Sequence, residues 1–286
     1  MKNHNLGFLG ISLAFAVVAF GCTAPAEKSE GKKSLAVKGS DTMVQLGQAW
    51  AEAFMKEHPD IQVSVTGGGS NTGIAALLNR GTDVCNASRQ IKPEELEQAK
   101  QKGLDVKEFI VAQDALSVIV HPSNPVTELT LAQIKDIYTG KTTNWKELGG
   151  PDRPIVLNSR ETSSGTYTFF TEHVLGKGVP MSEKAMLQPA TSEIVRTVAQ
   201  DAGGIGYVGL GYVTKEVKAL RIKKDASAPA VEGTVANVLN KSYPLARPLY
   251  EYTAVEPTGV VKTWLDWVMS DKGQEIVKKL DFVPIK

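Results

Sequence analysis

The sequence has little cysteine, almost no net charge and only one long apolar run. Its 286 residues include two cysteines, and 32 Lys and Arg residues nearly balance 31 Asp and Glu residues. A formal net charge of +1 gives no global attraction to nucleic acid or to an acidic membrane surface, so we expect no nucleic-acid partner. Any function that depends on charge must therefore be local.

Histidine is also scarce, with four in the chain. His58, His121 and His173 are far apart and lack metal-ligand spacing, so we expect no metal site. Residues 204–209 match the glycine spacing of a dinucleotide-binding turn, but they follow a helical pattern and are typical of a strand. We therefore expect no nucleotide cofactor.

The one long apolar run lies at the N-terminus. Residues 6–20 are uncharged, too short to span a bilayer comfortably, and typical of a signal peptide. Cys22 follows Gly21 at the end of this run, a pattern that resembles a bacterial lipoprotein signal. We predict a signal peptide over 1–21 and a lipid-anchored Cys22, in the periplasm or on the outer face of the cell membrane, with a polar tether over 22–33. The alternative is ordinary cleavage nearby, with Cys22 unmodified.

Beyond the tether, short apolar runs alternate with helical patterns, which indicates an α/β fold. We predict a helix over 42–59, a single helix over 163–176, and one or two helices over 258–280. Extended runs over 106–121 and 243–253 are long enough to pass from one lobe to another. The predicted lobes are residues 34–113 with 250–286, and residues 114–249.

Three predicted helix starts carry small polar residues directly after a strand: GSDTM (39–43), GGGSNTG (67–73) and SSGTYTF (163–169). A helix start presents unpaired N–H groups and the positive end of the helix dipole, which suit an anion. Each start is equally consistent with ordinary helix capping. Together with Arg160 and Arg89, the three starts favour a site for a small oxyanion.

These motifs resemble the phosphate-binding component of Pst-type ABC importers, which are type II periplasmic binding proteins. The matching stretches are GSDTM, GGGS, ASR, RETSSGT, IGYVGL and YPLARPLY, in family order over essentially the whole mature chain. The resemblance implies two α/β lobes joined by two extended hinge crossings, with phosphate in the cleft between them. It also implies a monomer that passes phosphate to an ABC permease, and not an enzyme.

The resemblance further implies a set of ligand-binding residues. Arg160 would give a bidentate fork to two oxygens, and most of the others would give hydroxyl or backbone N–H donors. The implied residues are Ser40, Asp41, Thr42, Met43, Ser70, Arg89, Arg160, Ser164, Gly165 and Thr166.

One position departs from the well-known members of the family. Arg89 stands where they have an aspartate, which accepts the proton of hydrogen phosphate and repels sulfate. Other members resemble this chain in having an arginine there, so phosphate is not excluded. The proton acceptor is left open between Asp41 and Glu161, and we predict Asp41. The alternative for Arg89 is a surface arginine at a strand end.

Three other functions stay open from the sequence. The same fold could bind another oxyanion, such as sulfate or molybdate, or serve as a surface sensor or adhesin. A hydrolase using Ser163 or Ser164 is the third, but no G-x-S-x-G elbow surrounds either serine.

Overall fold

The structure, a computed structural model, describes residues 33–286, which fall within a single compact unit. The predicted signal peptide, Cys22 and nearly all of the predicted tether lie outside the described residues. Within 33–286, no helix is both long and apolar enough to cross a membrane.

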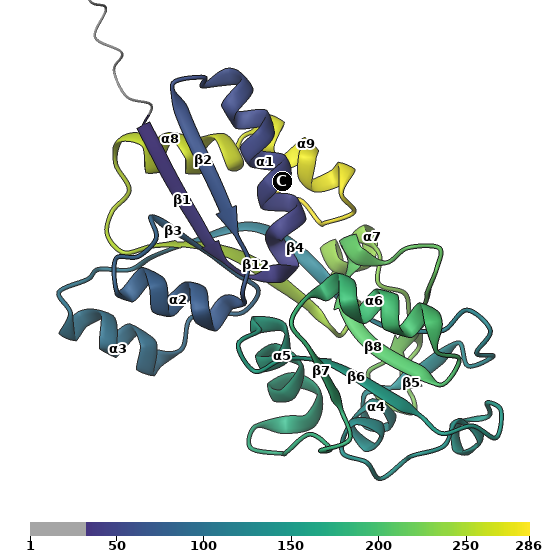
Figure 1. The fold of residues 1–286 in the computed structure, drawn as a ribbon. Helices are drawn as coiled ribbons and strands as arrows, with labels where there is room; N and C mark the ends of the chain where they lie inside the picture. Colours follow the sequence, from purple (N-terminus) through teal and green to yellow (C-terminus); the bar gives the residue numbers. More distant parts are fainter. Residues whose placement is uncertain (1–32) are drawn as a thin grey trace, which may run out of the picture. The chain divides into compact units, whose positions relative to one another are not determined.

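A parallel sheet covered by helices opens the described chain (Figure 1). We call it, with its helices, the first lobe. Its central strand β1 (Lys33–Gly39) pairs in parallel with β2 (Ile61–Thr66) and β3 (Val84–Ala87). The helical elements of this lobe are η1 (Asp41–Met43), α1 (Val44–Glu57), α2 (Ser70–Leu78), α3 (Pro93–Gln101), α8 (Gly259–Val268) and α9 (Asp271–Lys279).

Two long antiparallel strands, β4 (Lys107–Val120) and β12 (Ala246–Thr253), connect this lobe to the rest of the molecule. β12 lies between β3 and β4 and pairs with β4 along residues 107–115. β4 then continues past the end of β12 and pairs with β8 along residues 116–120. The strand order of the resulting sheet is β2-β1-β3-β12-β4-β8-β6-β7, so the predicted extended crossings are part of one continuous sheet.

The elements between β4 and β12 form what we call the second lobe. Its strands β6 and β8 are parallel, with α5 following β6 and the short helix η4 following β8. A separate small sheet is formed by β5, β10 and β11. The elements are β5 (Glu128–Thr130), α4 (Leu131–Tyr138), η2 (Trp145–Leu148), β6 (Val156–Arg160), α5 (Gly165–Phe170), η3 (Thr171–Gly176), β7 (Met186–Gln188), α6 (Thr191–Gln200), β8 (Gly204–Gly209), η4 (Leu210–Tyr212), β9 (Lys218–Ala219), β10 (Arg221–Lys223), β11 (Ala230–Val231) and α7 (Val235–Leu239).

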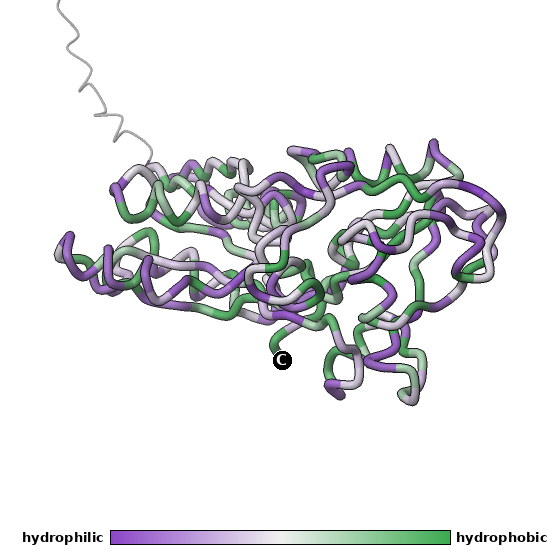
Figure 2. Tube along the Cα trace, turned by 90° about the horizontal axis from the view of Figure 1, so that it is seen from below, coloured by the Kyte–Doolittle hydropathy of each residue, from purple (hydrophilic) through white to green (hydrophobic). Residues whose placement is uncertain are grey.

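One hydrophobic core cluster fills most of the second lobe, and another is centred on the first lobe and extends into the second. Along the helices, hydrophobic and hydrophilic residues alternate (Figure 2), because one face is buried and the other meets solvent. In the first lobe, Trp50 of α1 is fully buried, and its indole N–H donates to the carbonyl of Gly273 in α9. The same core cluster includes Ile194 and Val198 of α6, so the two lobes pack against each other.

A buried ion pair lies where β4 passes from β12 to β8. The Arg247 guanidinium donates from Nε and Nη2 to Oδ2 of Asp114, at 3.0 and 2.8 Å, and neither side chain is more than 1% exposed. Oδ1 of Asp114 accepts the backbone N–H of Leu210, and Arg247 Nη1 donates to the carbonyl of Ser88. A buried charge is tolerated only with such partners, so this network fixes the geometry of the connection between the lobes.

The predicted elements are largely confirmed. Helix α1 occupies most of the range predicted as 42–59, and residues 204–209 form strand β8 as predicted. The prediction of a single helix over 163–176 is wrong in one respect. The α-helix α5 ends at Phe170, and the chain continues as the π-helix η3. The short strands β5, β7 and β11 were not predicted. The lobe boundaries at 113/114 and 249/250 stay a prediction.

Candidate functional site

Three of the predicted sequence motifs meet at one place. The starts of η1 and α2 come from the first lobe, and the start of α5 comes from the second. There, with a serine that follows β3, they form what we call the hydroxyl cluster: Thr42, Ser70, Ser88 and Thr166. None of the four is more than 1% exposed.

The hydroxyl cluster joins the two lobes directly. Thr42 Oγ1 lies 2.7 Å from Thr166 Oγ1, although the two residues are 124 positions apart. Ser88 Oγ lies 3.3 Å from both Thr166 Oγ1 and Ser70 Oγ. A hydroxyl group rotates its hydrogen toward whichever acceptor is present. Four buried hydroxyls at this spacing therefore suit a small anion that accepts hydrogen bonds from several directions.

Two glycines allow the lobes to come this close. A Cβ atom at Gly165 would lie 2.3 Å from Ser70 Oγ, and one at Gly69 would lie 2.3 Å from the carbonyl oxygen of Ser163. Gly69 also has a φ of +94°, which L side chains rarely adopt. A larger residue at either position would hold the first lobe away from the second.

Arg160 supplies a buried cation at the end of β6 and is 1% exposed. Its guanidinium donates to Thr191 Oγ1 at 2.8 Å and to the carbonyl oxygens of Pro189 and Gln188 at 2.7 and 3.3 Å. Burial lowers the pKa of Arg160 and the neighbouring Asp41 opposes that shift, but an arginine stays charged in any protein. Arg160 therefore places a permanent positive charge at the end of β6, 3.5 Å from Asp41 Oδ1.

The two candidate proton acceptors have other partners. Asp41 Oδ1 accepts the backbone N–H and the hydroxyl of Thr191, at 2.6 and 2.7 Å, and lies 3.5 Å from Arg160 Nη1. Glu161 Oε1 accepts the hydroxyl of Ser163 at 2.6 Å. No hydrogen bond joins either carboxylate to the hydroxyl cluster within the described chain, so the choice between them stays a prediction.

Three other predicted ligands lie at the helix starts as expected. The hydroxyl of Ser40 is buried and has no hydrogen-bond partner among the described residues. The backbone N–H of Met43 donates to the carbonyl of Ser40, and Ser164 caps α5 by accepting the N–H groups of Thr166 and Tyr167. The Ser40 hydroxyl is therefore the most available of these groups for a ligand, whereas the Met43 N–H is already paired.

Arg89 was expected to contact the anion, but its partners are protein groups. Its guanidinium donates to Asn71 Oδ1, to the carbonyl of Gln90 and to both carboxylate oxygens of Glu95. The side chain is 5% exposed, so it is not a surface arginine either. None of these bonds supports a direct contact between Arg89 and an anion.

Sequence reasoning missed three residues that the structure brings to this site: Ser88, Thr191 and Asn71. Ser88 directly precedes Arg89 in the ASR motif, and its place after a strand was the available signal. Thr191 and Asn71 carry contacts between the lobes, to Asp41 and to the segment at 162–163. No local pattern marks such contacts, because their partners are 91 and 150 positions away in the chain.

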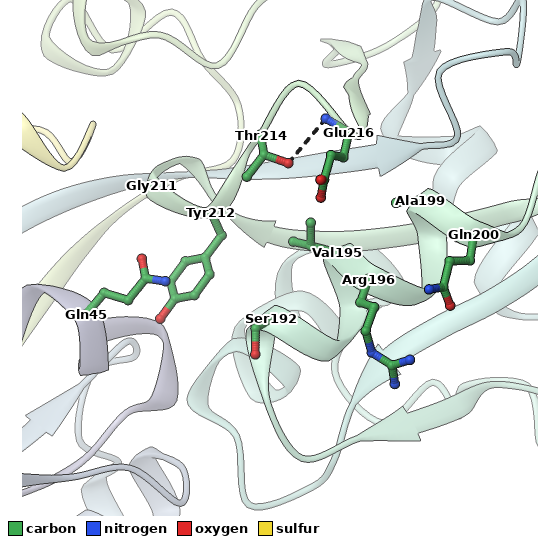
Figure 3. A pocket seen from close by; sticks show the side chains of 10 residues that line it. All are labelled: Gln45, Ser192, Val195, Arg196, Ala199, Gln200, Gly211, Tyr212, Thr214 and Glu216. Atoms are coloured by element: carbon green, nitrogen blue, oxygen red, sulfur yellow. Dashed lines mark hydrogen bonds between the residues drawn. The ribbon is translucent and has the colours of Figure 1, made fainter.

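A separate open cavity of about 690 Å³ lies beside this site, between Gln45 of α1 and a wall from α6 and the segment after β8 (Figure 3). Tyr212 lines it and donates its hydroxyl to the carbonyl of Asp41. The cavity contains no member of the hydroxyl cluster, so its volume says nothing about the anion site. Within residues 33–286, no three His, Cys, Asp or Glu side chains are grouped as metal ligands.

Comparison with known proteins places this chain in a family. A family model described as a PBP superfamily domain matches residues 24–272. The chain is 33% identical to the phosphate-binding protein PstS of Pseudomonas aeruginosa, over 96% of this chain and 91% of that protein. This chain belongs to the PstS family of the PBP superfamily. PstS of Bacillus subtilis is 31% identical, over all of this chain and 95% of that one.

A solved structure of similar fold comes from Clostridium perfringens, and is described as a phosphate ABC transporter substrate-binding protein with bound phosphate. It is 38% identical to this chain, with a TM-score of 0.81, and the match covers 89% of this chain and all of that one. This similarity confirms the fold predicted for this chain, a two-lobed α/β fold of the type II periplasmic binding class. The family consists of solute-binding proteins rather than enzymes.

Proposed function

We propose that this protein captures inorganic phosphate outside the cytoplasm and delivers it to an ABC importer. The observation that carries the proposal is the hydroxyl cluster, in which hydroxyls from both lobes approach to 2.7 Å. Arg160 is buried at the end of β6 and lies 3.5 Å from Asp41, the residue directly before Thr42. The names of the PstS relatives and the bound phosphate in the C. perfringens protein support the choice of anion.

The proposed mechanism is capture followed by closure. An anion between the lobes accepts hydrogen bonds from Thr42, Ser70 and Ser88 on one side and from Thr166 on the other. It replaces the bonds that the hydroxyls make to one another, so each donor keeps a partner. Only the closed form offers both sets of donors, so the ligand shifts the population toward closure. The closed form then docks on the permease.

Charge is balanced by Arg160, which we propose as the main cation for the anion. Charged hydrogen bonds in a site closed to water are stronger than neutral ones. Arg160 already bonds to Thr191, Pro189 and Gln188, and these fix the plane of the guanidinium before the ligand arrives. We propose that the protein releases the ligand chemically unchanged.

The lipid anchor at Cys22 is a separate part of the proposal. Its support is the sequence, in which Cys22 follows a short apolar run and Gly21. Mass spectrometry of the membrane fraction should find diacylglycerol on Cys22, and Cys22→Ala should release the protein into the soluble extracytoplasmic fraction. An unmodified N-terminus elsewhere would leave ordinary signal cleavage as the explanation.

Calorimetric titration of ligand-free protein with phosphate, sulfate and molybdate tests the function. We expect phosphate to bind most tightly, and Thr166→Val to weaken phosphate binding because the change removes a donor and adds a buried methyl group. Thr168→Val is the matched control, since Thr168 also lies in α5 and its hydroxyl donates to the carbonyl of Ser164 rather than to the hydroxyl cluster. Tighter binding of sulfate or molybdate, or no binding of phosphate, would contradict the proposal.

A further inference from the structure

Asn71, the second residue of α2, forms hydrogen bonds from the first lobe to the second. Its backbone N–H donates to the carbonyl of Ser163 at 3.0 Å, and its side-chain Nδ2 donates to the carbonyl of Thr162 at 2.8 Å. Gly69 lies so close to Ser163 that a Cβ atom would be 2.3 Å from that carbonyl. We call these four residues, Gly69, Asn71, Thr162 and Ser163, the closure seam. The seam exists only when the lobes are together.

The orientation of the Asn71 amide is fixed by Arg89. Nε and Nη2 of Arg89 both donate to Asn71 Oδ1, at 2.8 and 2.7 Å. A guanidinium has only donors, so it must face the oxygen of the amide and not the nitrogen. Because the oxygen is held toward Arg89, Nδ2 is directed toward the carbonyl of Thr162. A rotated amide would place its own donors against the cation and its oxygen against that carbonyl.

Arg89 is itself held from behind by Glu95 of α3. Nη1 donates to Oε2 at 2.8 Å and Nη2 to Oε1 at 2.6 Å, and the remaining Nη1 hydrogen goes to the carbonyl of Gln90. Burial raises the pKa of Glu95, but the hydrogen bonds from Arg89 and from the backbone of Lys92 outweigh it, so the net shift is downward. Glu95 is therefore ionised and Arg89 is neutralised locally.

All five N–H groups of Arg89 are occupied by these bonds, and its charge is matched by Glu95. We propose that Arg89 is a positioning residue, which favours ligand capture by holding Asn71 ready to bond to Thr162 across the cleft. The inference rests on the proposed function, since closure is the step that it assists. It also explains how an arginine is tolerated beside an anion site without adding a cation to it.

A double-mutant cycle with Asn71→Ala and Arg89→Ala tests this role, with the phosphate dissociation constant measured by calorimetry. Loss of the side-chain hydrogen bond to Thr162 should weaken phosphate binding roughly two- to tenfold in each single variant, while the backbone bond from residue 71 to Ser163 remains. The double variant should bind about as well as Asn71→Ala alone, because Arg89 acts through Asn71. The ratio of phosphate to sulfate affinity should not change in any of the three.

A direct contact between Arg89 and the anion would give a different result. Arg89→Ala would then weaken phosphate binding further, by tenfold or more, in the Asn71→Ala background, and would reduce the salt dependence of binding. That result would overturn the proposal. Because Arg89→Ala leaves the partly buried Glu95 without its partner, Arg89→Ala with Glu95→Gln is measured alongside it.

Asn71→Asp gives an independent test that leaves Arg89 and Glu95 in place. The new carboxylate still accepts both hydrogen bonds from Arg89, but its second oxygen faces the carbonyl of Thr162 and repels it. We expect a wild-type melting temperature and a wider distance distribution between labels at exposed positions on the two lobes, measured without ligand. An unchanged distribution would overturn the proposal. Failure of the wild-type protein to bind phosphate would instead contradict the proposed function, and the label distances would still report on the seam.

Discussion

Asp41 of the first lobe caps a helix of the second lobe. The helix is α6, which begins at Thr191, and its N-cap residue Ala190 has no side chain that caps it. Asp41 Oδ1 instead accepts the backbone N–H and the hydroxyl of Thr191, at 2.6 and 2.7 Å. A helix start has unpaired N–H groups and a partial positive charge, so a carboxylate there is favourable. Opening the lobes must break this contact.

Substitution of Asp41 should therefore change the balance between open and closed forms. Hydrogen bonds to a charged group contribute about 1.5–3 kcal/mol, so Asp41→Ala should favour opening by roughly ten- to a hundredfold. Asp41→Asn keeps an oxygen acceptor, and Asn caps helices about as well as Asp, so its effect should be under about 1 kcal/mol. The pair of variants separates the loss of the cap from the loss of the charge.

Small-angle scattering without ligand measures the balance, and calorimetry with phosphate and sulfate measures binding. Asp41→Ala should have a larger radius of gyration without ligand, and a lower phosphate affinity because fewer molecules are closed. Asp41→Asn should keep the wild-type ratio of phosphate to sulfate affinity. Suppose that ratio collapses in Asp41→Asn while the ligand-free radius is unchanged in both variants. The carboxylate then accepts the proton of the anion, and the capping argument is refuted.

Three further predictions concern charge, burial and close approach. Arg160→Ala should weaken phosphate binding by about ten- to a hundredfold in calorimetry. It should also lower the ligand-free melting temperature, because the carbonyls of Gln188 and Pro189 lose their donor. An unchanged affinity would show that Arg160 does not bind the anion. Burial raises the pKa of Glu251 from 4.5 to about 8, so the free energy of unfolding should fall as pH rises from about 5 to 8. In urea titrations Glu251→Gln should flatten that fall, and an equal dependence on pH in both proteins would argue against a raised pKa of Glu251. Gly165→Ala should weaken phosphate binding more than tenfold, because its Cβ would lie 2.3 Å from Ser70 Oγ. Gly81→Ala is the control and should bind phosphate normally, because the nearest atom to its Cβ would be 3.5 Å away.

The sequence by itself determined the local features of this protein. Helix starts, strand alternation and buried helix faces depend on residues a few positions apart, so their patterns are visible in a single chain. In the helix predicted over 42–59, Leu46, Trp50 and Phe54 are four residues apart and form the buried face. The start of α5 at Gly165 follows in the same way from the small residues before it. The motifs that mark the family are likewise short and local.

Only the tertiary structure decided which of these features touch. The sequence predicted Arg89 as an anion ligand because it follows a strand, but Glu95, Asn71 and the carbonyl of Gln90 together occupy its whole guanidinium. The sequence could not show that Asp41 bonds to Thr191, which is 150 positions away, and the role of Asp41 as proton acceptor stays a prediction. A buried polar group must find a partner wherever the packed chain places one. That partner depends on how the two lobes meet, and no spacing along the chain records it.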